Sequence, residues 1–233
     1  MKRIPCRFLA GLIPIALFLA SPSFPQVASE ANEGYKTADG RARVAKALND
    51  PARGERQKPR DIVDALDLKP GSTVADVGTG TGFMLPYLSH AVGDTGHVIG
   101  EDIQSDFLDK AKMKAQFSRL NNVQFVLGTD RDPGLPADTL EGVLVLDAYH
   151  HFDYPQAMLE HIRDSLLSDG KLVIVEYFKR PGAMNNPDPD FAVKHIRLDQ
   201  DDLIQEVETN GFRLVLKRDL VPKSQYMAVF EKN

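Results

Sequence analysis

The strongest constraint on the fold is a regular alternation of short apolar segments with helical segments between residues 73 and 177. The pattern predicts strands over residues 73–77, 96–100, 123–127, 142–146 and 171–177. It predicts helices over residues 83–91, 104–120 and 154–167 between them. Continuous apolar strands separated by helices indicate a parallel sheet covered on both faces.

The segments after residue 200 follow a different pattern. A helix is predicted over residues 201–210, with Gly211 just beyond its C-terminus. The strands predicted over residues 212–217 and 226–231 are joined by a loop too short for a parallel crossover, so they must be antiparallel. The predicted fold is therefore α/β: a doubly wound, mostly parallel sheet with helices on both faces and a C-terminal antiparallel hairpin.

Residues 1–28 have the pattern of a secretory signal peptide. A basic start precedes an apolar run over residues 8–20, and small residues and prolines offer cleavage points at residues 21–23 or at Val27-Ala28. The apolar run is shorter than the roughly 20 residues that span a bilayer as a helix. We expect an exported, periplasmic protein with no stable membrane span in its mature form. The alternative is an uncleaved N-terminal membrane anchor.

The rest of the chain divides into a charged segment over residues 29–58 and a main domain over residues 59–233. Asp50-Pro51 breaks the charged segment, so we expect a helix before it and a loop or short helix after it. Pro59 opens the first helix of the main domain.

Charge and cysteine content exclude several classes of function. Without residues 1–28 the formal charge moves from −5 (28 basic against 33 acidic residues) to −8 (25 against 33). An acidic chain is poorly suited to nucleic acid, which is bound mainly by neutralising phosphates. The single cysteine, Cys6, leaves with the signal peptide, which excludes thiol nucleophiles and thiolate metal sites. The sequence does not indicate an oligomeric state.

The turn after the first strand, over residues 78–82, reads Gly-Thr-Gly-Thr-Gly. Ligands of doubly wound sheets bind beside such turns, at the carboxyl ends of the strands. A dinucleotide-binding fold normally has G-x-G-x-x-G, but Phe83 occupies the position of the last glycine, which counts against a nicotinamide-dependent oxidoreductase. Asp76 precedes the first glycine by two residues, and a carboxylate there suits a ligand that carries an ammonium group.

With Asp76 and its three glycines, the chain resembles the class I S-adenosylmethionine (SAM)-dependent methyltransferases from about Pro59 to the C-terminus. The resemblance implies that SAM is the cofactor. It assigns the ribose hydroxyls to Asp102, with Glu101 as the alternative, and the face of the adenine to Ile103. The predicted cofactor site comprises Asp76, Gly78, Thr79, Gly80, Gly82, Asp102, Ile103 and Asp130. In that set Asp130 accepts a hydrogen bond from the adenine amino group, with Asp132 as the alternative.

The fourth strand is followed by the doublet His150-His151, close to where the methyl group of SAM would point. Either histidine can act as a general base, since imidazole titrates near neutral pH. The alternative is that one packs against the cofactor and the other caps the following helix. We predict no metal site, because adjacent residues on a loop rarely converge on one ion and the sequence shows no third ligand.

A second group of candidate residues lies nearer the substrate. The proline-rich loop over residues 177–198 resembles a lid, and Tyr149, His195 and Arg197 are candidates for substrate binding. For Arg197 the alternative is an ion pair with Asp199 or Asp201. The stretch around His195, together with the Arg-rich segment before the first strand, is similar to a group of predicted exported methyltransferases.

Methyl transfer demands little chemistry from the protein, because the sulfonium of SAM is already activated and the site need only align the nucleophile and exclude water. The sequence therefore predicts a methyltransferase that transfers the methyl group of SAM to a small-molecule nucleophile by in-line displacement. The alternative is a domain that binds SAM or its demethylated product without turnover, as a sensor or a partner-binding protein.

Overall fold

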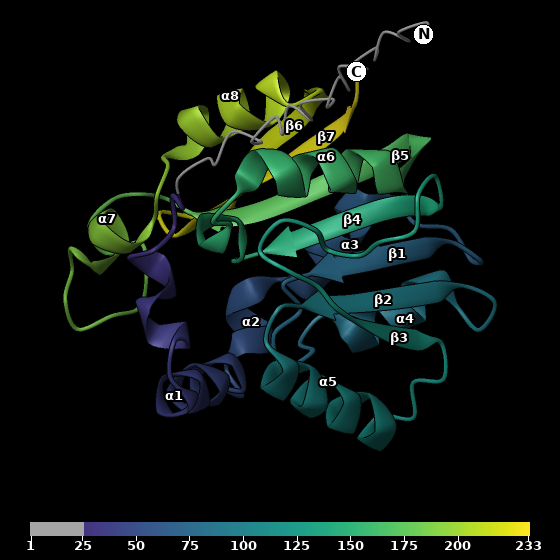
Figure 1. The fold of residues 1–233 in the computed structure, drawn as a ribbon, viewed down its shortest axis with the longest axis horizontal. Helices are drawn as coiled ribbons and strands as arrows, with labels where there is room; N and C mark the ends of the chain where they lie inside the picture. The colour runs from purple at the N-terminus through teal and green to yellow at the C-terminus, as the bar shows by residue number, and fades with distance from the viewer. Residues whose placement is uncertain (1–25) are drawn as a thin grey trace, which may run out of the picture.

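A seven-stranded sheet forms the centre of the structure, a computed structural model that describes residues 26–233 (Figure 1). The strands are β1 (Thr73–Val77), β2 (His97–Asp102), β3 (Val123–Leu127), β4 (Leu140–Leu146), β5 (Leu166–Tyr177), β6 (Phe212–Val221) and β7 (Gln225–Lys232). Their order across the sheet is β3-β2-β1-β4-β5-β7-β6. The first five strands are parallel, and β7 runs antiparallel to both β5 and β6. The predicted fold class is confirmed.

Helices cover both faces of this sheet (Figure 1). They are α3 (Pro59–Leu66), α4 (Leu85–Val92) and α5 (Ser105–Phe117) on one face, and α6 (Pro155–Ser165) and α8 (Gln200–Thr209) on the other. Alternate strand residues supply the two apolar cores. Val74 and Leu144 belong to the core beneath α3 and α4, whereas Ala75 and Val145 belong to the core beneath α6 and α8.

The segment before α3 crosses the carboxyl ends of the parallel strands. It contains η1 (Ala31–Tyr35), α1 (Ala38–Leu48) and α2 (Arg53–Gln57). The Thr37 hydroxyl begins α1 by accepting a hydrogen bond from the Gly40 amide. Arg41 of α1 forms an ion pair with Asp106 of α5 at 2.9 Å. The segment is thereby fixed to the main domain on the side where the strands end.

The signal peptide predicted over residues 1–28 lies almost entirely outside the described residues. Its last residues are described, and they pack on the main domain. The amides of Val27 and Ala28 both donate to Asp153, and Ala28 is buried. Among residues 26–233, no helix is both long and apolar enough to cross a bilayer.

One predicted boundary is wrong. A helix was predicted over residues 154–167 and a strand over 171–177, but residues 166–170 already belong to β5. The pairing of β5 with β4 steps from Leu140↔Leu166 to Gly142↔Lys171, so residues 167–170 bulge out of a continuous strand. Strand β6 is also longer than predicted, because β7 pairs with it as far as Val221.

Candidate functional site

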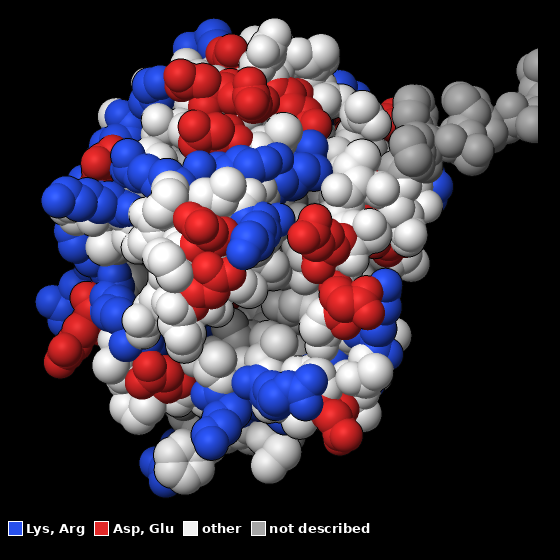
Figure 2. Space-filling view, turned by 90° about the vertical axis from the view of Figure 1, so that its left-hand side faces the viewer, with Lys and Arg blue, Asp and Glu red and all other residues white. Residues whose placement is uncertain are grey.

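A cavity of about 340 Å³ lies at the carboxyl ends of the parallel strands. Figure 2 looks onto this side of the molecule and shows a hollow surrounded by charged side chains. One wall comes from residues 78–80, 101–104 and 129–130, a second from residues 146–148, and a third from the segment that contains η1, α1 and α2. This is the place where doubly wound sheets bind their ligands.

The glycine turn brings backbone to the cavity wall. Gly78 has φ +72°, and a side chain there would begin 2.6 Å from the Cβ of Ala148, so only glycine fits. Thr79 and Gly80 also line the cavity, but Gly82 does not. Asp76 lies behind the turn, where its carboxylate accepts a hydrogen bond from the Thr79 hydroxyl at 2.6 Å.

Asp76 is therefore placed to shape the turn rather than to face the cavity. Its side chain is buried, and burial raises its pKa to about 6, with the hydrogen bond from Thr79 acting in the opposite direction.

Both acidic residues at the end of β2 line the cavity. Asp102 accepts hydrogen bonds from the amides of Gly80 at 2.9 Å and Gln104 at 2.8 Å. Burial nevertheless raises the pKa of Asp102 to about 6. Glu101 accepts one hydrogen bond from the Gly78 amide, and its other oxygen, Oε1, has no partner among the described residues although it is buried.

An unpartnered buried oxygen in a cavity wall suits a ligand that donates a hydroxyl hydrogen. The acceptor groups therefore fit a ribose, whose hydroxyls would donate to them. Asp102 remains the predicted ribose ligand, and Glu101 offers the free acceptor.

The adenine side of the predicted site is open. Ile103 is 44% exposed and lines the cavity together with Asp130. The alternative acceptor, Asp132, instead closes the loop. Its amide donates to the Thr129 hydroxyl, and its carbonyl accepts from the Thr129 amide.

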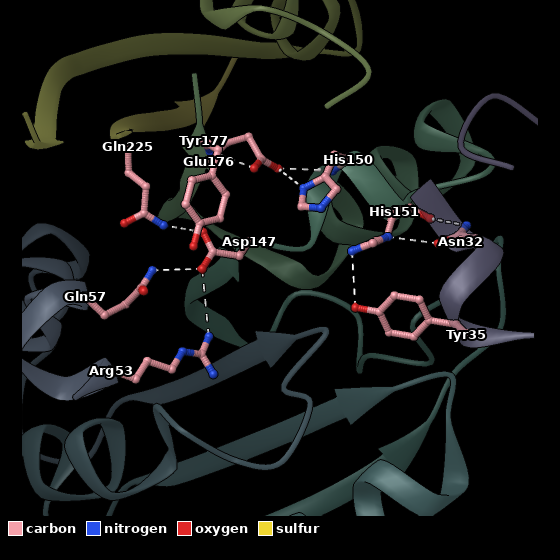
Figure 3. A network of polar contacts seen from close by, with 10 residues as sticks. All are labelled: Asn32, Tyr35, Arg53, Gln57, Asp147, His150, His151, Glu176, Tyr177 and Gln225. Carbon is pink, nitrogen blue, oxygen red and sulfur yellow. Dashed lines mark hydrogen bonds and ion pairs between the residues drawn. The ribbon is translucent and has the colours of Figure 1, made fainter. Parts of the chain in front are cut away.

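Asp147, directly after β4, contributes a mostly buried carboxylate that sequence reasoning did not select (Figure 3). It accepts hydrogen bonds from the side-chain amides of Gln57 at 2.9 Å and Gln225 at 2.6 Å, and Arg53 lies 3.9 Å away. Burial raises the pKa of Asp147 to about 7, although the charge of Arg53 opposes the shift. Its backbone is in the left-handed region, with φ +52°.

The His150-His151 doublet occupies η2 (Tyr149–His151), and the two rings have different surroundings (Figure 3). His151 lines the large cavity and contacts Asn32 and Tyr35 of the N-terminal segment. His150 lies behind it, with Nδ1 2.7 Å from the buried carboxylate of Glu176.

His195, on the short helix α7 (Phe191–His195), packs against both rings of the doublet. Burial lowers the pKa of His151 well below its ordinary value and that of His195 to about 4. Both rings are therefore neutral near pH 7, and His151 has the geometry of a proton acceptor at the cavity wall.

Tyr149 and Arg197 do not line the large cavity. The Tyr149 hydroxyl donates to Glu206 at 2.7 Å, and Arg197 donates to the same carboxylate at 2.9 Å. The ion pair of Arg197 is thus with Glu206 on α8, and not with Asp199 or Asp201. These contacts anchor η2 to α8.

The N-terminal segment supplies site residues that sequence reasoning missed. Tyr35, Leu48 and Arg53 line the cavity, and the guanidinium of Arg53 lies 4.5 Å from the ring centroid of Phe83. The only signal in the sequence was the group of arginines over residues 53–60, which does not reveal a contact across the fold.

Comparisons with known proteins agree with this geometry. A family model described as a methyltransferase domain matches residues 74–170. The demethylmenaquinone methyltransferase of Oceanobacillus iheyensis is 30% identical over 117 residues, which cover 50% of this chain and 49% of the relative. Phosphoethanolamine N-methyltransferase 3 of Arabidopsis thaliana is 26% identical over 200 residues, 77% of this chain and 40% of the relative. The chain thus spans about half the length, or less, of these curated relatives.

A solved structure extends the similarity over most of the described chain. A SAM-dependent methyltransferase from Aquifex aeolicus is 27% identical with a TM-score of 0.74, over 82% of this chain and 98% of that one. The family match, the strand order and the acceptor groups of the cavity agree. The chain is therefore similar to the class I SAM-dependent methyltransferases, whose cofactor is S-adenosylmethionine.

Proposed function

We propose that this protein transfers the methyl group of SAM to a small-molecule nucleophile by in-line displacement. The observation that carries the proposal is a single cavity with two chemically different walls. One wall, with the glycine turn, Glu101 and Asp102, suits the cofactor, and the other carries Asp147 and His151.

The size of the cavity supports a small acceptor. Its volume of about 340 Å³ falls in the range of small-molecule pockets, roughly 300–1,000 Å³. The names of two relatives, a demethylmenaquinone methyltransferase and a phosphoethanolamine N-methyltransferase, also point to small acceptors.

The residues of this chain would then divide the work. The turn at Gly78 and the acidic pair hold the cofactor, which supplies a methyl group activated by its sulfonium. His151 accepts a proton where the acceptor must lose one, and the N-terminal segment excludes water from the cavity.

Calorimetric titration with SAM and with its demethylated product tests the cofactor site. We expect the wild-type protein to bind both, and Asp102→Ala to bind SAM at least tenfold more weakly, since charge-assisted hydrogen bonds contribute roughly 1.5–3 kcal/mol. Asp169→Ala, at an exposed residue of the β5 bulge, is the control and binds like wild type. An absence of wild-type binding at millimolar SAM would refute the proposal. Unchanged affinity in Asp102→Ala would move the ribose contact to Glu101.

Transfer of labelled methyl from SAM to a panel of hydroquinones, catechols and primary amines tests turnover. We expect one class of acceptor to be labelled, and His151→Ala to lower that rate. If SAM is bound but no acceptor is labelled, the alternative of a SAM-binding domain without turnover is favoured.

A further inference from the structure

Three imidazole rings meet at the edge of the cavity, from two segments far apart in the sequence. His150 and His151 belong to η2 and His195 to α7. One ring nitrogen from each lies within 4.8 Å of the other two. Nitrogens bound to a tetrahedral zinc ion at 2.0–2.1 Å are roughly 3.4 Å apart, so rotation of these side chains can bring them onto one ion.

His150 is held in the orientation of a metal ligand. Its Nδ1 donates to Glu176 at 2.7 Å, and its own backbone amide donates to the same carboxylate oxygen at 3.1 Å. The other oxygen of Glu176 accepts from the Tyr177 amide. Within residues 26–233 the Nε2 of His150 makes no hydrogen bond, so its lone pair is free. Histidine ligands of metals almost always donate their second ring N–H to a carboxylate or carbonyl in this way.

His151 has the same arrangement with a different acceptor. The side-chain amide of Asn32 donates to the His151 carbonyl and to Asp153, which turns its carbonyl oxygen toward the ring. The Nδ1 of His151 donates to that oxygen at 2.9 Å. This leaves a lone pair on Nε2, where the Tyr35 hydroxyl is a weak partner at 3.3 Å.

His195 completes the group. Its ring stacks on Phe191, with the ring centroids 4.7 Å apart and the planes 22° apart. No other described residue forms a hydrogen bond with its ring nitrogens, so either can turn toward an ion.

The surrounding charge also favours a cation. Glu176 and Asp147 are close enough to repel each other electrostatically, and both are largely shielded from solvent. Among the described residues, Asp147 has one ion pair, with Arg53 at 3.9 Å. Buried carboxylates are stable when a positive charge balances them.

We propose that His150, His151 and His195 bind a divalent transition-metal ion of the zinc type through three imidazole nitrogens. Imidazole suits zinc, copper, iron and nickel. Three protein ligands leave one tetrahedral position open, as in catalytic zinc sites. Because His151 lines the cavity, the ion lies at its wall, where it can bind an oxygen or nitrogen of the acceptor and lower the pKa of that group. This role replaces proton transfer to His151, because the ion occupies the lone pair of its Nε2. That last role rests on the proposed methyl transfer, whereas the binding of the metal does not.

The test uses the untagged full-length chain, stripped of metal by a chelator and titrated without SAM. Calorimetry with Zn²⁺ gives the stoichiometry and affinity, and the visible absorption of Co²⁺ reports tetrahedral coordination. We expect one ion per chain, with affinity lowered at least 100-fold in His195→Ala and roughly 10- to 100-fold in Glu176→Gln, which removes only the partner of a ligand. His161→Ala, an exposed histidine on α6, binds like wild type.

A second variant separates loss of the ligand from loss of the fold. His195→Phe keeps an aromatic ring against Phe191 and removes both nitrogens, so it should fold like wild type and lose the Co²⁺ band. The proposal is overturned if the wild-type chain shows no saturable Zn²⁺ binding, or if His195→Phe binds Zn²⁺ as tightly as wild type. Because SAM is absent from this titration, its failure would leave the proposed methyl transfer standing.

Discussion

Asp147 combines three unusual properties: a left-handed backbone, a mostly buried carboxylate and two side-chain amides that donate hydrogen bonds to it. The left-handed conformation is tolerated because aspartate and asparagine enter this region more readily than other side chains except glycine. Its contacts with Gln57 and Gln225 tie α2 and β7 to the end of β4. A residue that ends a central strand thus fixes one wall of the cavity.

The raised pKa of Asp147 predicts a pH dependence of stability. A carboxyl group with a pKa of about 4 in the unfolded chain and about 7 in the folded chain takes up protons on folding. Its contribution to the free energy of unfolding is therefore full below pH 4 and lost as the pH rises to 7. We expect Asp147→Asn to gain stability relative to wild type over this interval, by at most about 1.4 kcal/mol per pH unit.

Urea unfolding of both proteins between pH 4.5 and 8.5 measures this difference. Asp138→Asn is the matched control, because Asp138 also has a positive φ, +47°, but an exposed side chain. Its difference from wild type should not vary with pH. A constant difference for Asp147→Asn would show that its carboxyl group titrates normally.

Residue identities at the strand ends were predictable, but their partners were not. Glu101 and Asp102 end the buried strand β2, Asp130 follows the edge strand β3, and parallel strands bring their carboxyl ends to one edge of the sheet. The role of Asp147 depends on Gln57 and Gln225, which lie 90 and 78 residues away in the sequence. No local pattern encodes such contacts.

At the scale of elements, periodicity predicted most helices and strands because each has one apolar face or an apolar run. It failed at the β5 bulge, where Ser168, Asp169 and Gly170 have the composition of a turn while Leu166 keeps its pairing with Leu140. It also did not place η1, α1 and α2 over the cavity, since polar helices carry no signal of their position. His195 was predicted as a substrate-binding residue, but its contact with the His150-His151 doublet was not predicted.

The N-terminal segment and the main domain both line the cavity, so a bound ligand should contact both and stabilise the packing of the segment on the domain. Tyr35, Leu48 and Arg53 lie on one side and residues 78–80 on the other. At a SAM concentration ten times its Kd, we expect tryptic cleavage within residues 29–58 to slow roughly tenfold, because the ligand lowers the population of the open form.

Mass spectrometry of timed digests measures cleavage at each site. Cleavage after Lys179, in the loop after β5, serves as the internal control, since Lys179 does not line the cavity and its cleavage should not change. Equal protection of residues 29–58 and of the loop after β5 would indicate that SAM stabilises the whole chain and not this segment in particular.

At the scale of the whole molecule, we propose that the chain is exported and loses its N-terminal signal. The packing of Val27 and Ala28 on Asp153 favours cleavage before Gln26, because cleavage after Ala28 would remove these contacts. We expect a periplasmic form that begins between residues 21 and 26, identified by fractionation and N-terminal sequencing.

Two outcomes would contradict this proposal. A full-length chain in the membrane fraction would support an uncleaved anchor, and a mature chain beginning at Ser29 would place the cleavage after Ala28. A variant without residues 2–20 is the control and should remain in the cytoplasm.

The position of β7 between β5 and β6 has a consequence for biogenesis. Strand β7 is the last described strand to be translated. Yet β6 joins the sheet only through β7, which lies between β5 and β6. Strand β6 therefore cannot join the sheet until residues 225–232 have been synthesised. Under the proposed export, this edge of the sheet is still unpaired when almost all of the chain has been made, and unpaired segments can be threaded through a translocation channel.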